Sequence, residues 1–153
     1  MLAPYVVSTI FVLAIVILCV VRPNAGRIFL GFFYLAMAIG VNGFFLLTYA
    51  QGYEEYLSGA LLPLYQELTA RTVALYPVFY GLLLFVFEVA MGLLLLSKRI
   101  YVKIGLLGTT IFLMALAPVS TLQWPWLGLA AAQIYLLTKE FDRSLVEMLR
   151  SRG

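Results

Sequence analysis

Long apolar segments are the feature that most constrains this chain. A helix needs about 20 predominantly apolar residues to cross the ~30 Å hydrocarbon core of a bilayer, and most of the sequence consists of such runs. Of the 153 residues, 64% are hydrophobic and 11% are charged, whereas soluble domains are about 45–50% apolar and about 25% charged. A soluble domain of this size could not bury so much apolar surface. The sequence therefore predicts one all-α membrane domain over residues 1–153.

Five transmembrane helices are predicted from the apolar runs. The last run, from Ile104 to Thr138, would reach about 52 Å at 1.5 Å per residue, which is too long for one span. Pro118 and Pro125 interrupt it. Because proline disfavours helix at its own position and at the preceding residue, we divide this run into two helices joined by a tight turn. The predicted spans are residues 4–21, 28–50, 73–96, 102–117 and 122–139.

The distribution of basic residues tests this number of spans. The segments after the first and third spans and the C-terminal tail carry lysine and arginine, whereas the segment after the second span is net acidic and the turn after the fourth is uncharged. Basic residues stay on the cytoplasmic side of a membrane. Five spans therefore place the N-terminus outside and the C-terminus in the cytoplasm, and we expect an inner membrane of the bacterial type.

Two segments are predicted to lie at the membrane surface. Residues 51–72 are rich in tyrosine and leucine and are broken by Gly52, Gly59 and Pro63. Tyrosine favours the membrane interface, so this segment is expected to lie on the outer surface or to cap the mouth of the bundle. Residues 141–152 have apolar side chains at helical spacing with arginines between them, which predicts a short interfacial helix or a frayed helix end.

Glu88 is the most informative polar residue. It lies in the third predicted span, about 14 Å above the inner end and close to the midplane of a ~30 Å hydrocarbon layer. An acidic group at that depth costs at least a few kcal/mol, so such residues face the bundle interior and usually pair with a polar group. Three roles fit: a hydrogen-bond donor to a carbonyl ligand, a proton relay, or an interhelical hydrogen bond. A ligand-binding role and a purely structural role both stay open.

Depth along the helices ranks the partners of Glu88. Tyr34, about 9 Å above the inner edge, is expected within side-chain reach, and Thr109 and Gln133 have similar inner depths on the fourth and fifth spans. Asn42 is expected higher, at about 21 Å. Together these side chains would line a polar seam through the bundle, which either binds a ligand or joins the helices. The predicted seam comprises Glu88, Tyr34, Asn42, Thr109, Gln133 and Tyr80.

Two short motifs occur in the second and third predicted spans. The first is Arg27-Ile-Phe-Leu-Gly31-Phe-Phe, and the second is Glu88-Val-Ala-Met-Gly92 followed by a leucine run and a basic turn. Together they resemble the DoxX-like family of small four-helix membrane proteins. The resemblance covers about residues 27–139, so the first span would be an N-terminal addition to that four-helix core. At Asn42, before Gly43, the chain departs from the family, which often carries a lysine or another polar residue after glycine.

The resemblance implies a function beside a membrane redox system. Members of the family are associated with such systems, including a quinone-linked thiosulfate oxidoreductase. We therefore predict a non-catalytic or accessory subunit of a larger redox or respiratory complex in electron transport, in contact with quinone or lipid. The alternative is a membrane protein that binds a small ligand, lipid or quinone, or a transporter, through the Glu88 seam. Membrane lipids and other membrane subunits are the expected partners.

Residue content disfavours several other functions. The chain has no histidine and one cysteine, Cys19, which excludes an intramolecular disulfide, a CxxC redox pair and histidine-built metal sites. The net charge of +3 is scattered and forms no basic stripe for nucleic acid. No Ser/His/Asp set and no glycine-rich phosphate loop is present. We therefore expect no catalytic residues, no metal site and no intrinsic cofactor, and an enzyme acting alone is disfavoured.

Overall fold

The computed structural model describes residues 2–151, and every regular element in that range is a helix. Three of these helices are long and apolar enough to cross a membrane: Ala3–Val21, Pro23–Thr48 and Pro77–Leu96. The all-α class predicted from the sequence is therefore confirmed for the described residues, and the three long helices make the chain a helical membrane protein.

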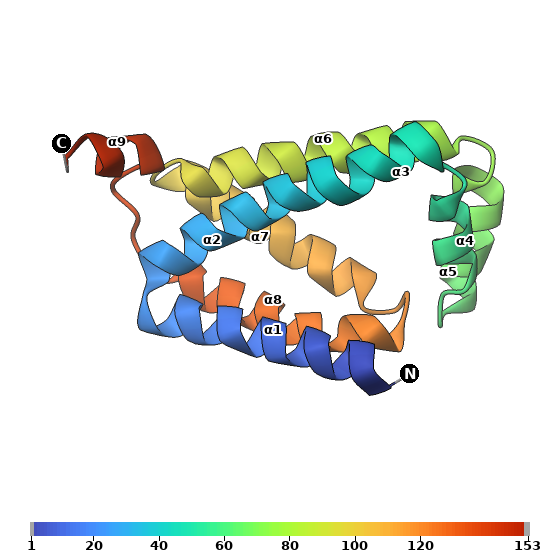
Figure 1. The fold of residues 1–153 in the computed structure, drawn as a ribbon, viewed down its shortest axis with the longest axis horizontal. Coiled ribbons are helices and arrows are strands. Elements are labelled where there is room, and N and C mark those ends of the chain that lie inside the picture. Colours follow the sequence, from blue (N-terminus) through green and yellow to red (C-terminus); the bar gives the residue numbers. More distant parts are fainter. Residues whose placement is uncertain (1, 152–153) are drawn as a thin grey trace.

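The long helices form five rods, which lie side by side along the length of the molecule (Figure 1). One of them is continuous but irregular, because α2 passes through a π-helix, η1, into α3. Contacts join α2 to α6, α6 to α7, α7 to α8, and α1 to both α8 and α2. At 17 and 14 residues, α7 and α8 are shorter than a typical span. The rods are α1 (Leu2–Val21), α2 (Pro23–Ala36), η1 (Met37–Asn42), α3 (Gly43–Thr48), α6 (Pro77–Leu96), α7 (Ile100–Leu116) and α8 (Trp124–Leu137).

Three of the long helices have a proline at their first or second position, and this shifts the boundaries expected from sequence. The second rod begins at Pro23 rather than residue 28, and α6 begins at Pro77 rather than residue 73. In α8, Pro125 lies in the first turn, after a short 3-10 helix, η3 (Thr121–Gln123). Proline is tolerated there because the first N–H groups of a helix have no intrahelical partner. These prolines therefore mark the starts of helices as well as the breaks between them.

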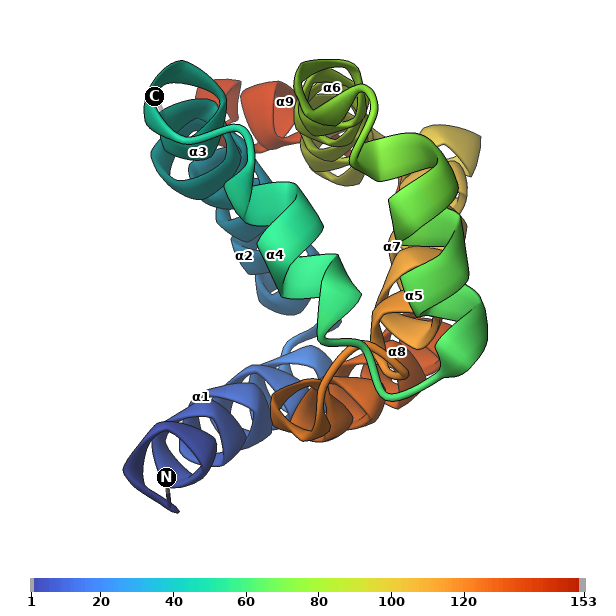
Figure 2. The same ribbon diagram turned by 90° about the vertical axis from the view of Figure 1, so that its right-hand side faces the viewer.

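The segment predicted to lie at the interface caps one end of the bundle. It forms α4 (Gly52–Ser58), α5 (Pro63–Leu68) and a second π-helix, η2 (Thr69–Val73). Seen end-on, α4 and α5 cross the end of the long rods (Figure 2). The Leu61 N–H donates to the Pro118 carbonyl at 3.0 Å, and the Tyr65 hydroxyl donates to the Ala115 carbonyl at 2.8 Å. These bonds attach the cap to the end of α7 and the turn that follows it.

Two glycines bring α2 and α6 into backbone contact. A β-carbon on Gly92 would lie 2.9 Å from the carbonyl oxygen of Gly31, and one on Gly31 would lie 3.1 Å from the carbonyl oxygen of Gly92. Small residues permit this close approach between membrane helices. The antiparallel contact sets the register between the two helices that carry the polar residues of the cavity described below.

Arg27 joins three parts of the chain at the opposite end of the bundle. Its side chain is fully buried. One guanidinium nitrogen donates to the carbonyls of Leu95, at 2.9 Å, and Ser97, at 2.7 Å, and another donates to the carbonyl of Arg143. The guanidinium also lies 5.0 Å from the ring centroid of Phe141. Arg27 thus supplies donors to carbonyls at the end of α6, which lack intrahelical partners, and holds the C-terminal tail against them.

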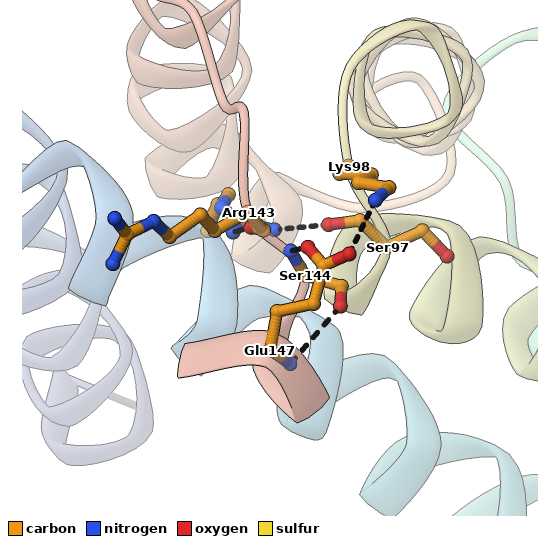
Figure 3. Close-up of polar contacts among 6 residues, drawn as sticks. Ser97, Lys98, Arg143, Ser144 and Glu147 are labelled. Carbon is orange, nitrogen blue, oxygen red and sulfur yellow. Dashed lines mark hydrogen bonds and ion pairs between the residues drawn. The ribbon is translucent and has the colours of Figure 1, made fainter. Parts of the chain in front are cut away.

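The C-terminal helix is shorter than the predicted interfacial helix over residues 141–152. Helix α9 covers Leu145–Arg150, and residue 152 lies outside the described range. The Ser144 hydroxyl accepts from the Glu147 N–H at 3.3 Å, while the Glu147 carboxylate accepts from the Ser144 N–H at 2.9 Å and from Lys98 (Figure 3). Residues before Ser144 are not helical, because their carbonyls bind other parts of the protein: Arg27 binds one, and the Arg99 N–H donates to Phe141 at 2.7 Å.

Acidification is expected to release α9 from the bundle. The hydrogen bond from Lys98, and then those from Ser144, hold the pKa of Glu147 below its ordinary value of 4.5. A carboxylate with a lowered folded pKa stabilises the folded state above its ordinary pKa and loses that contribution as the pH falls through the folded value. A spin label at Leu149 should therefore gain mobility below pH 4.5. Glu147→Gln should give the mobile state at neutral pH, whereas Glu140→Gln, at an exposed position, should not; equal mobility in both variants would contradict this assignment.

Candidate functional site

A cavity of about 420 Å³ lies inside the capped end of the bundle. Residues of α2, η1, α3, α6, α7 and α8 line it, together with residues of α4 and η3 at the capped end. Ligand pockets are typically about 300–1,000 Å³, mostly apolar, with a few placed polar groups. This cavity has that character. Its apolar wall includes Phe33, Val41, Leu84, Phe112, Leu113 and Trp126.

Three polar residues from different helices meet at the wall of this cavity. The Asn42 amide donates to Glu88 Oε2 at 2.6 Å, and the Tyr53 hydroxyl donates to the Asn42 side-chain oxygen at 3.1 Å. Asn42 and Glu88 are buried, and all three line the cavity. Within residues 2–151 no hydrogen bond reaches the second carboxyl oxygen of Glu88. That oxygen is available to a molecule in the cavity.

The partner of Glu88 differs from the one expected. Depth alone ranked Tyr34 first and put Asn42 well above Glu88, but Asn42 makes the hydrogen bond. Side chains lean toward the N-terminus of their own helix. Since α2 and α6 are antiparallel, Asn42 and Glu88 lean toward each other and close the gap that counting from the backbone predicts.

The other members of the predicted seam form a separate cluster. The hydroxyls of Thr109 and Thr110 on α7 lie 2.9 and 3.1 Å from Gln133 Oε1 on α8, and the contact joins the two helices. Tyr34 is 2% exposed and its ring lines the cavity, but its hydroxyl oxygen is sealed from the cavity and lies beside Gln133 and Thr109. The single seam expected from sequence is therefore two clusters, with Tyr34 the member of the second that lines the cavity.

Tyr80 lies outside both clusters. It lines a shallow apolar groove between α6 and α7, together with Leu83, Phe87 and Ile111. Its ring packs edge-on against Phe79, with centroids 5.4 Å apart. The side chain points away from the Asn42–Glu88 pair because Tyr80 is eight positions from Glu88, about 80° around the helix. Tyr80 is therefore not part of the polar seam, contrary to the prediction from the sequence.

Aromatic residues at the capped end of the bundle also belong to the cavity. Trp126 stacks on Phe33 with centroids 5.6 Å apart and planes at 26°, and both rings line the wall. Trp124, by contrast, is 54% exposed. Tyr53 likewise comes from the segment predicted to be interfacial. The sequence shows that aromatic residues are dense in this region. That density does not distinguish a pocket wall from a membrane interface, because a ring with one polar group suits both.

Glu88 has no basic partner in the structure. Across residues 2–151 the ion pairs join Arg71 to Glu67 and Lys98 to Glu147. The same residues contain no group of three or more His, Cys, Asp or Glu side chains placed to hold a metal. What the site offers a ligand is one carboxyl, one amide and phenol hydroxyls, set in an apolar and aromatic wall. Such an arrangement is chemically suited to hydrogen bonds and apolar contact with a small molecule.

No family model, curated protein or solved structure matches this chain. The long apolar helices and the cavity define its class, which is a helical membrane protein with an internal, mostly apolar cavity. Its function must be inferred from the residues that line that cavity.

Proposed function

We propose that this protein binds a small, largely apolar molecule within the membrane, with Glu88 as the polar anchor. The observation that carries the proposal is the buried Asn42–Glu88–Tyr53 cluster on the wall of a cavity of about 420 Å³. A purely structural carboxyl would use its oxygens to join helices, but one oxygen of Glu88 is left for a ligand. Lipids and quinones, which have an apolar body and hydrogen-bonding oxygens, match this chemistry.

Helix α4 covers the mouth of the cavity and would control access to it. Tyr53 ties α4 to the carbonyl of Asn42 at 3.0 Å, and Tyr56 accepts a hydrogen bond from Gln123 of η3. Both tyrosines and Gln123 line the cavity. These bonds involve side chains rather than a packed core, so we propose that α4 opens when they break and admits the ligand.

We further propose that all five rods cross the membrane. Helix α7 packs against α6 and α8, helix α8 also packs against α1, and both are apolar. Helix α1 begins at the end capped by α4 and α5, while α9 lies at the other end (Figure 1). The basic segments after α1, α6 and α8 share the end of α9, which supports a cytoplasmic C-terminus and an N-terminus outside. An inner membrane of the bacterial type stays a prediction.

Membership of the DoxX-like family and a place in a redox complex stay predictions. A ligand cavity fits an accessory, non-catalytic subunit that holds quinone or lipid beside a larger complex. It equally fits a protein that binds such a ligand on its own. The two possibilities differ in whether the purified protein carries partner subunits, and they share the cavity as the binding site.

Filling the cavity is expected to weaken ligand binding at least about tenfold, since a bulky side chain would displace the ligand's apolar body. Leu84→Trp places the indole at the wall, whereas Leu82→Trp, on the same helix at a position 51% exposed, leaves the cavity open. Binding of a decyl-substituted benzoquinone and of oleic acid is measured by calorimetry in lipid nanodiscs. Equal affinities in the two variants, or no saturable binding to the wild-type protein, would sink the proposal.

A substitution at Glu88 separates the binding role from the structural role. Glu88→Gln keeps the shape and the capacity to bond Asn42, but it removes the carboxyl. If Glu88 anchors the ligand, affinity falls roughly three- to tenfold while the melting temperature hardly moves. If Glu88 only joins helices, the substitution is tolerated, because glutamine keeps the bond to Asn42, and neither the melting temperature nor the ligand affinity changes.

A further inference from the structure

We infer that the molecule bound in the cavity carries one long hydrocarbon chain, which leaves the cavity between α6 and α7 and lies in the shallow groove on the outside of these helices. Its compact polar head, without a phosphate group, would stay inside beside Glu88. The inference rests on the proposed function, and it narrows the ligand from any small apolar molecule to a single-chain amphiphile.

The first observation is that the cavity and the groove share a wall. Leu84 of α6 and Phe112 of α7 line both spaces, and each is half-buried. Phe112 also packs against Phe87, which lines the groove, with ring centroids 5.2 Å apart. At this point the partition between the two spaces consists of side chains. Because side chains change rotamer far faster than helices move, a hydrocarbon chain can pass where Leu84 and Phe112 separate.

The second observation is that α6 and α7 diverge toward the cap (Figure 1). Near the turn that joins them, Gly105 brings the two backbones together, because a β-carbon there would lie 3.2 Å from the Leu95 backbone nitrogen. Tyr80, in the first turn of α6, and Ile111, in the last two turns of α7, both line the groove. The groove therefore extends to the capped end, where opening of α4 would let a chain enter between the two helices.

The residues that line the two spaces select the two parts of the ligand. Glu88 lies one turn beyond Leu84 on α6, about 6 Å along the axis, so a head bound to its free oxygen lies next to the shared wall. The groove is apolar apart from the Tyr80 hydroxyl, which suits a hydrocarbon chain. Among residues 2–151, no lysine or arginine lines either space. A phosphate head would therefore be buried beside a carboxyl without a cationic partner, and phospholipids do not fit.

Two benzoquinones with the same ring test this inference, one with a hexadecyl chain and one with an ethyl group. Their affinities for the full-length protein in nanodiscs are measured by calorimetry, for the wild type and for Ile111→Trp. Ile111 lines only the groove, so the indole fills the groove and leaves the cavity open. The long-chain compound should bind the variant at least about tenfold more weakly, since overpacking forces the chain into strained positions, whereas the ethyl compound should bind within about twofold of the wild type.

Matched variants on both helices control for the added indole. Leu107 is exposed one turn from Ile111 on α7 and lines neither space, so Leu107→Trp should leave both affinities unchanged. Leu83→Trp repeats the test from α6, because Leu83 lines only the groove, and it should act as Ile111→Trp does. Hexadecyl phosphate should not displace the long-chain benzoquinone from the wild-type protein.

Each outcome bears on the inference. If the long-chain compound binds Ile111→Trp as tightly as Leu107→Trp, or if both groove variants weaken the two compounds by the same factor, the chain does not lie in the groove and the inference is wrong. The cavity then remains a binding site if Leu84→Trp weakens binding. Displacement by hexadecyl phosphate would refute the assignment of the head. If neither benzoquinone binds the wild type saturably, the inference fails, and the proposed function fails with it unless oleic acid binds. Melting temperatures of the tryptophan variants separate lost binding from lost folding.

Discussion

Replacing Arg27 with leucine is expected to lower the free energy of unfolding by about 3–5 kcal/mol, because an acceptor left buried without a donor costs about 1–3 kcal/mol. Three carbonyls, those of Leu95, Ser97 and Arg143, would lose their guanidinium donors. Removing a buried charge from the protein offsets part of this cost, so the total stays below the sum of three separate losses. The C-terminal tail should detach in the same variant.

Two controls define the origin of this effect. Arg27→Lys keeps the charge, but an ammonium group lacks the several planar donors of a guanidinium and cannot bind all the carbonyls. We therefore expect an intermediate decrease in the free energy of unfolding. Arg22→Leu removes an exposed arginine just before α2, the helix that carries Arg27, and it should change stability by no more than about 0.5 kcal/mol. Unfolding is followed by circular dichroism in bicelles. Similar stabilities for Arg27→Leu and Arg22→Leu would refute the structural role of Arg27.

Gly92→Ala is expected to lower the free energy of unfolding by about 1–3 kcal/mol, the usual cost of overpacking. The new β-carbon would lie 2.9 Å from the Gly31 carbonyl oxygen and 2.8 Å from Leu35 Cγ. The leucine side chain can move, but the backbone carbonyl cannot without displacing α2. The two helices should therefore separate, and the hydrogen bond between Asn42 and Glu88 should lengthen.

The matched control is Gly40→Ala. A β-carbon at Gly40 has no neighbour within 4 Å, so stability should change by no more than about 0.5 kcal/mol. Ligand affinity gives a second readout, because only Gly92→Ala should disturb the polar cluster in the cavity. If the two alanine variants unfold at the same temperature and bind equally well, backbone contact does not hold α2 and α6 in register.

The general architecture was predictable because it follows from composition and from the length of the apolar runs. Boundaries were less predictable, because proline has two opposite meanings for a helix: it ends one that precedes it and starts one that follows. Pro23 and Pro77 start helices. Whether a proline ends or starts a helix depends on which groups the backbone on either side of it hydrogen-bonds. That choice depends on tertiary structure, which no local pattern contains.

The candidate site was predictable in part. A lone carboxylate in an apolar run is costly in any fold, so Glu88 could be singled out from the sequence. Its neighbours could not, because their positions depend on the lean of side chains and on the register between two helices. Arg27 shows the same limit: its charge predicted orientation, but its burial depends on Ser97 and Arg143, which are distant in sequence.

The π-helix η1 has a consequence for how one rod can serve both ends of the cavity. In a regular α-helix, residues eight positions apart point about 80° away from each other. A π-helix has more residues in each turn, so each residue between Met37 and Asn42 advances through a smaller angle. This angular lag swings Asn42 back toward the direction in which Tyr34 points, and both line the cavity. One wide turn thus lets a single helix hold its two polar side chains in phase.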